Sequence, residues 1–168
     1  MSKKTKPINS DIENEINCFQ KEIFESNGIE LTNLIKHSES KEYSACRFRL
    51  NNFNIEYRVS KITPTKTGQF VTIWKRDKKG LTAPFDTCDD LDFIIITSKY
   101  GNRIGQFIFP KSILIGKGII SQNGIGGKRG IRVYPPWDNV ENNQALKTQH
   151  WQNQFFSESI TLELLRRL

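Results

Sequence analysis

The residues best suited to chemistry in this chain are basic and aromatic side chains spaced among strand-forming residues. The segment 58–79 carries seven basic residues and a single acid, Asp77. The segment 99–132 carries seven basic residues and no acid, whereas residues 1–45 hold six basic and eight acidic residues. Strand backbones hold cations at fixed spacings, and concentrated positive charge is typical of nucleic-acid binders. We therefore expect a phosphate-rich partner, DNA or RNA.

Contact with nucleic acid requires cations for the phosphates and flat side chains on which bases stack. The loops at 63–68 and 124–130 contain glycine and lysine, and could also offer backbone N–H groups to an anion. We expect nucleic acid to contact Lys61, Lys66, Trp74, Lys75, Arg76, Lys111, Lys128, Arg129, Arg132, Lys147 and Gln149. The alternatives are core packing for Trp74 and an ordinary solvated surface for the lysines. The GxxxxGK[ST] phosphate loop is absent from the sequence, so ATP binding has little support.

A second hypothesis is a divergent metal-dependent nuclease. Restriction-type nucleases use an acid at the start of a central strand and a Glu/Gln-x-Lys on the next strand. Asp92 precedes the apolar run 93–97, and Gln106 and Lys111 belong to the following predicted strand. Five positions separate Gln106 from Lys111, so the two side chains would leave a regular strand on opposite faces. One Asp is also a thin ligand set for two metal ions. We therefore expect a binding protein without catalysis, metal or cofactor.

Length and composition indicate one folded domain. The chain has 168 residues, of which 36% are hydrophobic and 11% aromatic, with a net charge of +7. We expect a single domain over 1–168, with 1–9 as a flexible tail. No apolar run approaches the ~20 residues needed to span a bilayer, so we expect no membrane partner. The three cysteines are widely spaced, which fits a reducing cytoplasm better than a disulfide framework.

Apolar periodicity predicts a helix, a series of strands and then further helices. The expected elements are a helix from Ser10 to Gly28, a short helix within 30–43, a hairpin over 43–60, strands at 69–74, 91–97, 104–109 and 132–134, a helical turn at 112–117, and helices at 139–156 and 162–168. The spacing of Asp138 and Glu141 matches a capping box at the start of the 139–156 helix. This order predicts an α+β fold with a central mixed, mainly antiparallel sheet. N- and C-terminal helices would flank that sheet around a restriction-endonuclease-like core.

Several segments together resemble the MepB-like family over about residues 15–156. The motifs that carry the resemblance are EYSACRFRLN at 42–51, RVSKITPTKTGQFVTIWKR at 58–76, GQFIFPK at 105–111, GKR at 127–129, RVYP at 132–135, WD at 137–138 and KTQHWQ at 147–152. The resemblance implies a small bacterial cytoplasmic α/β protein. The namesake of the family is encoded beside a MarR-type regulator and a multidrug efflux pump. The resemblance implies no catalytic residues.

A third hypothesis is an anion-binding small-molecule or protein-interaction module linked to drug-efflux operons. An enclosed pocket would favour this hypothesis, whereas an open basic face would favour nucleic acid. The sequence leaves open DNA versus RNA, sequence preference and oligomeric state.

Overall fold

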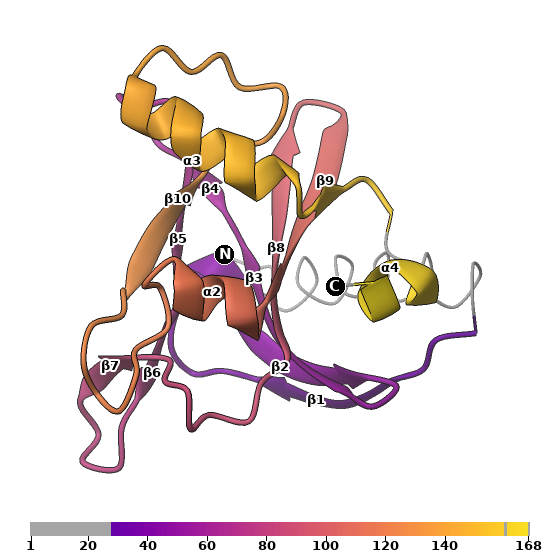
Figure 1. The fold of residues 1–168 in the computed structure, drawn as a ribbon. Helices are drawn as coiled ribbons and strands as arrows, with labels where there is room; N and C mark the ends of the chain where they lie inside the picture. The colour runs from indigo at the N-terminus through magenta and orange to yellow at the C-terminus, as the bar shows by residue number, and fades with distance from the viewer. Residues whose placement is uncertain (1–27, 160, 168) are drawn as a thin grey trace, which may run out of the picture.

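The computed structural model describes residues 28–159 and 161–167, and sheets dominate this part of the chain (Figure 1). The expected first helix and the expected tail at 1–9 lie outside the described residues. The largest sheet has six strands in the order β1 (Leu31–Lys36), β2 (Cys46–Leu50), β3 (Phe53–Val59), β8 (Phe93–Tyr100), β9 (Arg103–Pro110) and β11 (Phe156–Ser157). The β3–β8 pair is parallel and the other pairs in this sheet are antiparallel. The mixed, mainly antiparallel sheet of an α+β fold is thus confirmed.

Two small sheets and short helices complete the described fold. One small sheet consists of β10 (Gly130–Val133), β5 (Gln69–Thr72) and β4 (Lys61–Ile62), and the other of β6 (Trp74–Arg76) and β7 (Thr82–Pro84). The helices are the 3-10 turn η1 (Lys41–Tyr43), α2 (Lys111–Gly116), α3 (Asn143–Asn153) and α4 (Leu162–Arg167). Within the described part of the chain, no helix is long and apolar enough to cross a membrane.

The two faces of the large sheet bury different sets of residues because side chains alternate along each strand. On one face, Phe48, Tyr57 and Ile95 pack in a cluster that includes Leu165 of α4. On the other face, Ile96 and Phe107 pack in a cluster that includes Leu114 of α2. Val71 and Val133 of the neighbouring small sheet belong to the same cluster, as does Ile73, which follows β5. We call these the α4 face and the α2 face. Figure 1 shows α2 and α4 on opposite sides of β8 and β9.

The short helix expected within 30–43 is reduced to the single 3-10 turn η1, because residues 31–36 form β1 and pair antiparallel with β2. The pairing register shifts between Thr32 and Ile35, and Asn33 in this interval has a positive φ of 56°. A bulge of this kind lets an irregular segment pair with an existing strand. Pairing with β2 therefore overrides the weak local preference of this polar stretch.

The long C-terminal helix is shorter at its start than the expected 139–156. The helix α3 begins at Asn143, and the Asn142 side chain accepts hydrogen bonds from the backbone N–H groups of Gln144 and Ala145, at 2.9 and 3.2 Å. Asn142 is thus the N-cap, in place of the expected capping box at Asp138 and Glu141. An Asn side chain in an extended backbone satisfies the unpaired N–H groups of the first turn.

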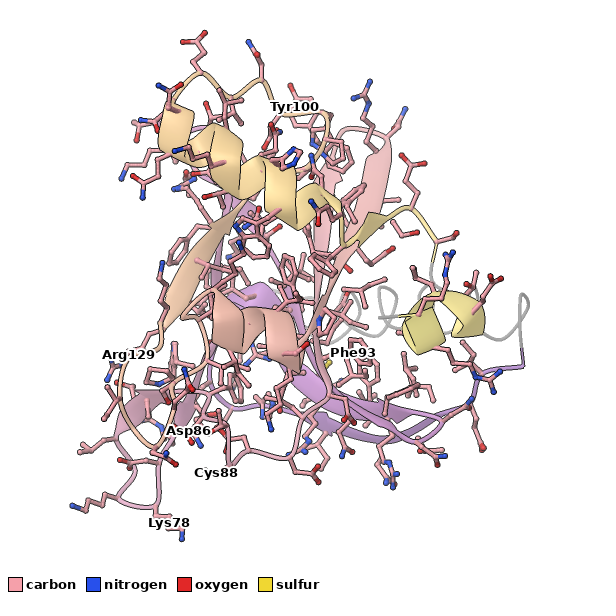
Figure 2. All side chains as sticks on the ribbon, in the orientation of Figure 1. Lys78, Asp86, Cys88, Phe93, Tyr100 and Arg129 are labelled. Carbon is pink, nitrogen blue, oxygen red and sulfur yellow. The ribbon has the colours of Figure 1, made fainter. Side chains whose placement is uncertain are left out.

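Asp86 ties the chain between β7 and β8 to the loop that precedes β10. Its carboxylate accepts hydrogen bonds from Ser121 Oγ at 2.6 Å, Gly124 N at 2.8 Å and Cys88 N at 3.1 Å. Figure 2 shows Asp86 beside this loop. These donors favour the charged carboxylate, so the pKa of Asp86 lies well below its ordinary value.

We expect replacement of Asp86 by Asn to destabilise the fold at pH 7 and to reduce its acid sensitivity. A carboxyl group whose pKa is lowered by folding stabilises the protein above the unfolded pKa of about 3.9, and this contribution is lost as the pH falls through the folded pKa. Urea unfolding at pH 7 and at steps down to pH 2 measures the difference, with Glu158→Gln as an exposed-carboxylate control. Equal stability of Asp86→Asn and the parent protein at pH 7 would contradict this role.

Candidate functional site

A cleft of about 920 Å³ lies between the β10–β5–β4 sheet and α3. Figure 1 shows α3 lying across the end of β10. The charged residues that line the cleft are Lys66, Lys117, Lys128, Arg132 and Glu141. Aromatic and polar residues complete the lining: Phe70, Tyr134, Trp151, Asn139, Asn142, Gln144, Thr148 and Gln152. Four cations against one carboxylate make the lining strongly positive.

Arg132 on β10 holds the loop at 63–68 that forms one rim of the cleft. One terminal nitrogen donates to the backbone oxygens of Thr67 and Gly68, both at 3.2 Å, and the other donates to Thr63 Oγ1 at 2.8 Å. The guanidinium of Arg132 is therefore largely used in positioning the loop. Lys66, which is exposed at the same rim, is left to meet a ligand.

Gln152 fixes α3 against β10 at the base of the cleft. Its buried side-chain amide accepts a hydrogen bond from Tyr134 N at 2.9 Å and donates one to Arg132 O at 2.9 Å. Gln149 donates to the carbonyl oxygens of Pro135 and Asp138, both at 3.0 Å, and so holds the segment that leads from β10 toward α3. The Gln149 amide nitrogen, expected to contact nucleic acid, is thus engaged within the fold.

Trp74, Lys75 and Arg76 lie at a different place, where they line a second pocket of about 300 Å³. Lys75 Nζ is 2.5 Å from Asp89 Oδ1, and Arg76 Nε is 3.1 Å from Glu39 Oε1. The Arg76 guanidinium also lies over the Trp74 ring, at 5.5 Å from its centre. The expected basic segment at 74–76 is therefore neutralised by acids that come from distant parts of the sequence.

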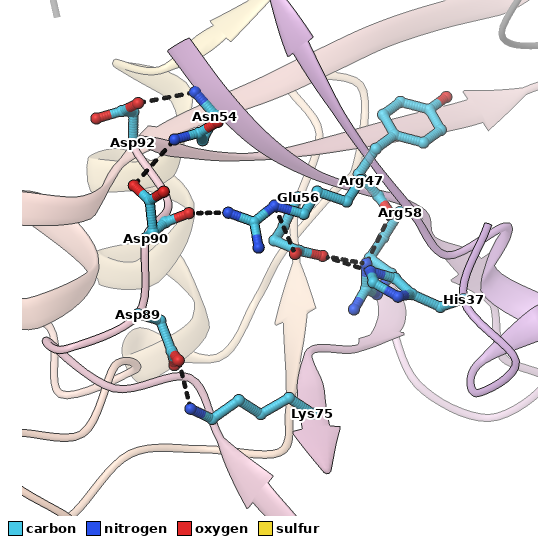
Figure 3. A network of polar contacts seen from close by, with 10 residues as sticks. His37, Arg47, Asn54, Glu56, Arg58, Lys75, Asp89, Asp90 and Asp92 are labelled. Carbon is cyan, nitrogen blue, oxygen red and sulfur yellow. Dashed lines mark hydrogen bonds and ion pairs between the residues drawn. The ribbon is translucent and has the colours of Figure 1, made fainter. Parts of the chain in front are cut away.

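The floor of this second pocket is a buried ion pair on β3. Glu56 and Arg58 are 3% and 2% exposed, and Glu56 Oε2 lies 3.3 Å from Arg58 Nη1 and 2.9 Å from His37 Nε2 (Figure 3). Burial lowers the pKa of Arg58, and the neighbouring Glu56 opposes that shift. Breaking a buried pair of this kind typically costs about 3–5 kcal/mol. Sequence reasoning missed this pair, although the alternation Glu56-Tyr57-Arg58 marked both residues as sharing one face.

The remaining residues expected to bind nucleic acid do not line the large cleft. Lys61 Nζ lies 5.2 Å from the centre of the Tyr43 ring, Lys111 Nζ donates to Asp89 O at 2.6 Å, and Arg129 donates to Thr82 O at 3.1 Å. Lys147 is exposed on α3 and lines a shallower hollow beside the cleft. Of the expected set, the structure brings together Lys66, Lys128 and Arg132 in the cleft.

The residues of the nuclease hypothesis do not form one constellation. Asp92 Oδ2 accepts a hydrogen bond from Asn54 N at 2.7 Å, next to the start of β8. Gln106 pairs with Thr97, four positions along β9 from Pro110, which corresponds to roughly 13 Å of strand. Its side chain is buried, and its Oε1 has no hydrogen-bond partner among the described residues. Within residues 28–159 and 161–167, no group of three or more His, Cys, Asp or Glu side chains is placed to hold a metal.

The geometry defines a class of protein: a sheet-dominated α+β domain with one basic cleft and one charge-balanced pocket. In a comparison with protein families, residues 37–158 match the MepB-like family model. The chain belongs to the MepB-like family. A solved structure described as the crystal structure of MepB is 32% identical and superimposes with a TM-score of 0.75. The match covers 86% of this chain and 95% of that chain. A search of curated proteins gives no match.

We expect Gly68→Ala to destabilise the cleft rim more than an equivalent change elsewhere. Gly68 has a φ of +82°, and an added Cβ would lie 2.6 Å from the Tyr134 ring and 3.0 Å from Val133 O. Gly80→Ala is the matched control, since Gly80 has a φ of +78° and open space around the added Cβ. Both changes carry the strain of a positive φ, of the order of 1 kcal/mol.

Urea unfolding of the two variants separates the steric effect from backbone strain. We expect Gly68→Ala to lose more stability than Gly80→Ala, because the Tyr134 ring must move. Equal losses in the two variants would show that Tyr134 does not pack on Gly68 as described.

Proposed function

We propose that this protein binds nucleic acid through the cleft between the β10–β5–β4 sheet and α3. The observation that carries the proposal is the lining of the cleft, where Lys66, Lys117, Lys128 and Arg132 face a single carboxylate, Glu141. The phosphates of one nucleic-acid chain lie on Lys66, Lys117 and Lys128, while Arg132 positions the loop at the rim. Neutralising phosphates with lysine releases the counterions condensed on the nucleic acid, and this release supplies much of the binding free energy.

The cleft also offers surfaces for sugars and bases. Trp151 and Tyr134 are partly exposed, and Lys117 Nζ lies 5.2 Å from the centre of the Trp151 ring. Aromatic side chains stack on bases regardless of sequence, and the polar side chains of α3 provide hydrogen bonds to sugars and phosphates. Rigid support for this surface comes from Gln152 and Arg132, which connect α3, β10 and the loop at 63–68.

We also propose that the large sheet contains a restriction-endonuclease-like core. The supporting observation is the antiparallel run β1-β2-β3, continued by β8 parallel to β3. Asp92 precedes β8 and Lys111 begins α2, where Lys111 N donates to Asp92 O at 2.9 Å, whereas Gln106 lies farther along β9. The proposal therefore concerns the arrangement of strands and includes no cleavage reaction.

The test of the proposed cleft is a pair of matched double variants. We expect Lys66→Ala with Lys128→Ala to weaken binding of duplex and single-stranded probes of any sequence. Loss of two phosphate contacts should reduce the slope of log K against log salt by about 1.8 for duplex and about 1.4 for single strands. Fluorescence anisotropy over a series of salt concentrations measures this slope.

Lys78→Ala with Lys79→Ala is the control, because it removes the same charge from the exposed turn between β6 and β7, outside both pockets. We expect this control to retain most of the affinity and nearly the parent slope. Equal effects of the two double variants would reject the cleft as the binding surface, and failure of the parent protein to bind any probe at low salt would reject nucleic-acid binding itself.

A further inference from the structure

At the floor of the pocket of about 300 Å³, one oxygen of Glu56 is ion-paired but accepts no hydrogen bond from the described residues. Glu56 Oε2 receives hydrogen bonds from His37 Nε2 and Arg58 Nη1. The cation recorded nearest to the other oxygen, Oε1, is Arg47 Nε at 3.9 Å, which is too long for a hydrogen bond. Within the described residues, Oε1 therefore lacks a hydrogen-bond donor. A nearly buried carboxylate oxygen that lines a pocket favours a ligand that donates an N–H or O–H.

Arg58 shows that the polar network of the pocket is incomplete. Its side chain is 2% exposed, and its Nε is buried without a hydrogen-bond partner among the described residues. The guanidinium also lies 5.9 Å from the centre of the Phe85 ring, which lines the same pocket. Buried polar groups are nearly always paired, so an unpaired one calls for a physical explanation. In the part of the chain that the structure describes, the polar network under the pocket thus lacks a hydrogen bond at two atoms, Arg58 Nε and Glu56 Oε1.

The walls and rim of the pocket add an aromatic surface and cations. Trp74 lines the pocket and is partly exposed, so its ring is available for stacking. Lys75 and Arg76 follow it on β6, and Arg47 lies beside Glu56 in the β2–β3 register. Figure 3 shows Glu56 between Arg47 on one side and His37 and Arg58 on the other, with Lys75 and Asp89 farther along the pocket.

The net charge of the pocket lining indicates whether a phosphate ion or a nucleotide is the better ligand. Four cations, Arg47, Arg58, Lys75 and Arg76, are matched by four carboxylates, Glu39, Glu56, Asp89 and Asp90. A bare phosphate would gain little net attraction here, in contrast to the cleft. A nucleotide fits better, because its base offers N–H donors and a flat ring while its phosphate reaches the cations at the rim. The volume lies at the lower end of the range for small-molecule sites.

We propose that this pocket is a nucleotide site that accepts a base with an exocyclic amine. The amine donates to Glu56 Oε1, the ring stacks on Trp74, and the phosphate accepts from the remaining N–H donors of Lys75 and Arg76, which stay paired with Asp89 and Glu39. Uracil fits poorly, because its carbonyl oxygens flank its single ring N–H and would face the carboxylate. The nucleotide is either free or part of a longer chain. This site is separate from the proposed nucleic-acid cleft and does not depend on it.

The test uses AMP, CMP, GMP, UMP and inorganic phosphate as probes of the full chain. We expect the first three nucleotides to quench tryptophan fluorescence and to bind at least ten-fold more tightly than UMP or phosphate in calorimetric titrations. The variant Trp74→Phe should lose most of the quenching, although Trp137 and Trp151 remain. Equal binding of UMP and CMP, or unchanged quenching in Trp74→Phe, would overturn the proposal.

The variant Glu56→Gln tests whether Glu56 accepts the hydrogen bond from the base. The readout is the preference for CMP over UMP and not the stability of the protein. An amide can present either oxygen or NH₂ to the pocket, so we expect the preference for CMP over UMP to shrink at least five-fold. Circular dichroism checks that the variant folds. If Glu56→Gln does not fold, Lys75→Ala replaces it, with an expected loss of at least three-fold in CMP affinity and little change for cytidine. Unchanged selectivity in a folded Glu56→Gln variant, or equal effects of Lys75→Ala on CMP and cytidine, would contradict the assignment.

Two further measurements distinguish the source of the nucleotide and separate this site from the cleft. If the bound nucleotide belongs to a chain, Trp74→Phe weakens binding of cytosine-containing oligonucleotides; if it is free, oligonucleotide affinity is unchanged while CMP binding is lost. Both outcomes support the site. The variant Lys66→Ala with Lys128→Ala should leave CMP binding intact, whereas loss of CMP binding in that variant would place the nucleotide in the cleft and overturn the proposal.

Discussion

The carboxylate of Glu56 and the guanidinium of Arg58 are buried two residues apart on the strand β3, and the neighbouring strands are arranged around them. Because isolated charges are very costly to remove from water, each must find partners within the fold. His37, which follows β1, and Arg47 on β2 both approach Glu56. Phe85 lies over the Arg58 guanidinium, but these polar groups need more than an apolar layer above them. The small sheet with Val71 and Val133 therefore packs over β8 and β9, where the α2 face is apolar, and a pocket is left beside β3.

Cations with similar sequence surroundings have different partners in the fold. Lys75 and Arg76 are paired with Asp89 and Glu39, which lie 14 and 37 positions away along the chain. Lys66 and Lys128 line a cleft whose single acid is Glu141. A surface cation that is already paired offers less attraction to a phosphate than a free one, and exposed pairs add little stability. The distribution of acids in space, rather than the number of bases in a segment, thus decides which basic block can act on a partner.

Strands were the part of the fold most readily predicted from the sequence. Alternation of apolar and polar residues over 46–59 corresponds to β2 and β3, because side chains of a strand point alternately to its two faces. The continuous apolar run before Thr97 corresponds to β8. The weakly patterned stretch at 30–43 predicts a short helix somewhere within it, but no strand. Only pairing with β2 makes residues 31–36 a strand. The predicted start of α3 was wrong for a similar reason, since both Asp138 and Asn142 are suitable caps. The segment beyond Pro135 forms a turn in which Asp138 N donates to Pro135 O at 2.9 Å, and Gln149 holds this turn.

The sequence by itself determined an α+β domain of the MepB-like family, with Lys66, Lys128 and Arg132 among the basic residues and Glu56 and Arg58 on one face of a strand. These properties depend on residue type and local spacing, which the chain carries without folding. Only the tertiary structure decided that Arg132 holds the rim of the cleft, that Lys75 and Arg76 are neutralised, and that Glu56 and Arg58 are buried. Burial and pairing depend on which distant segments meet, and electrostatic free energy depends steeply on distance and solvent exposure.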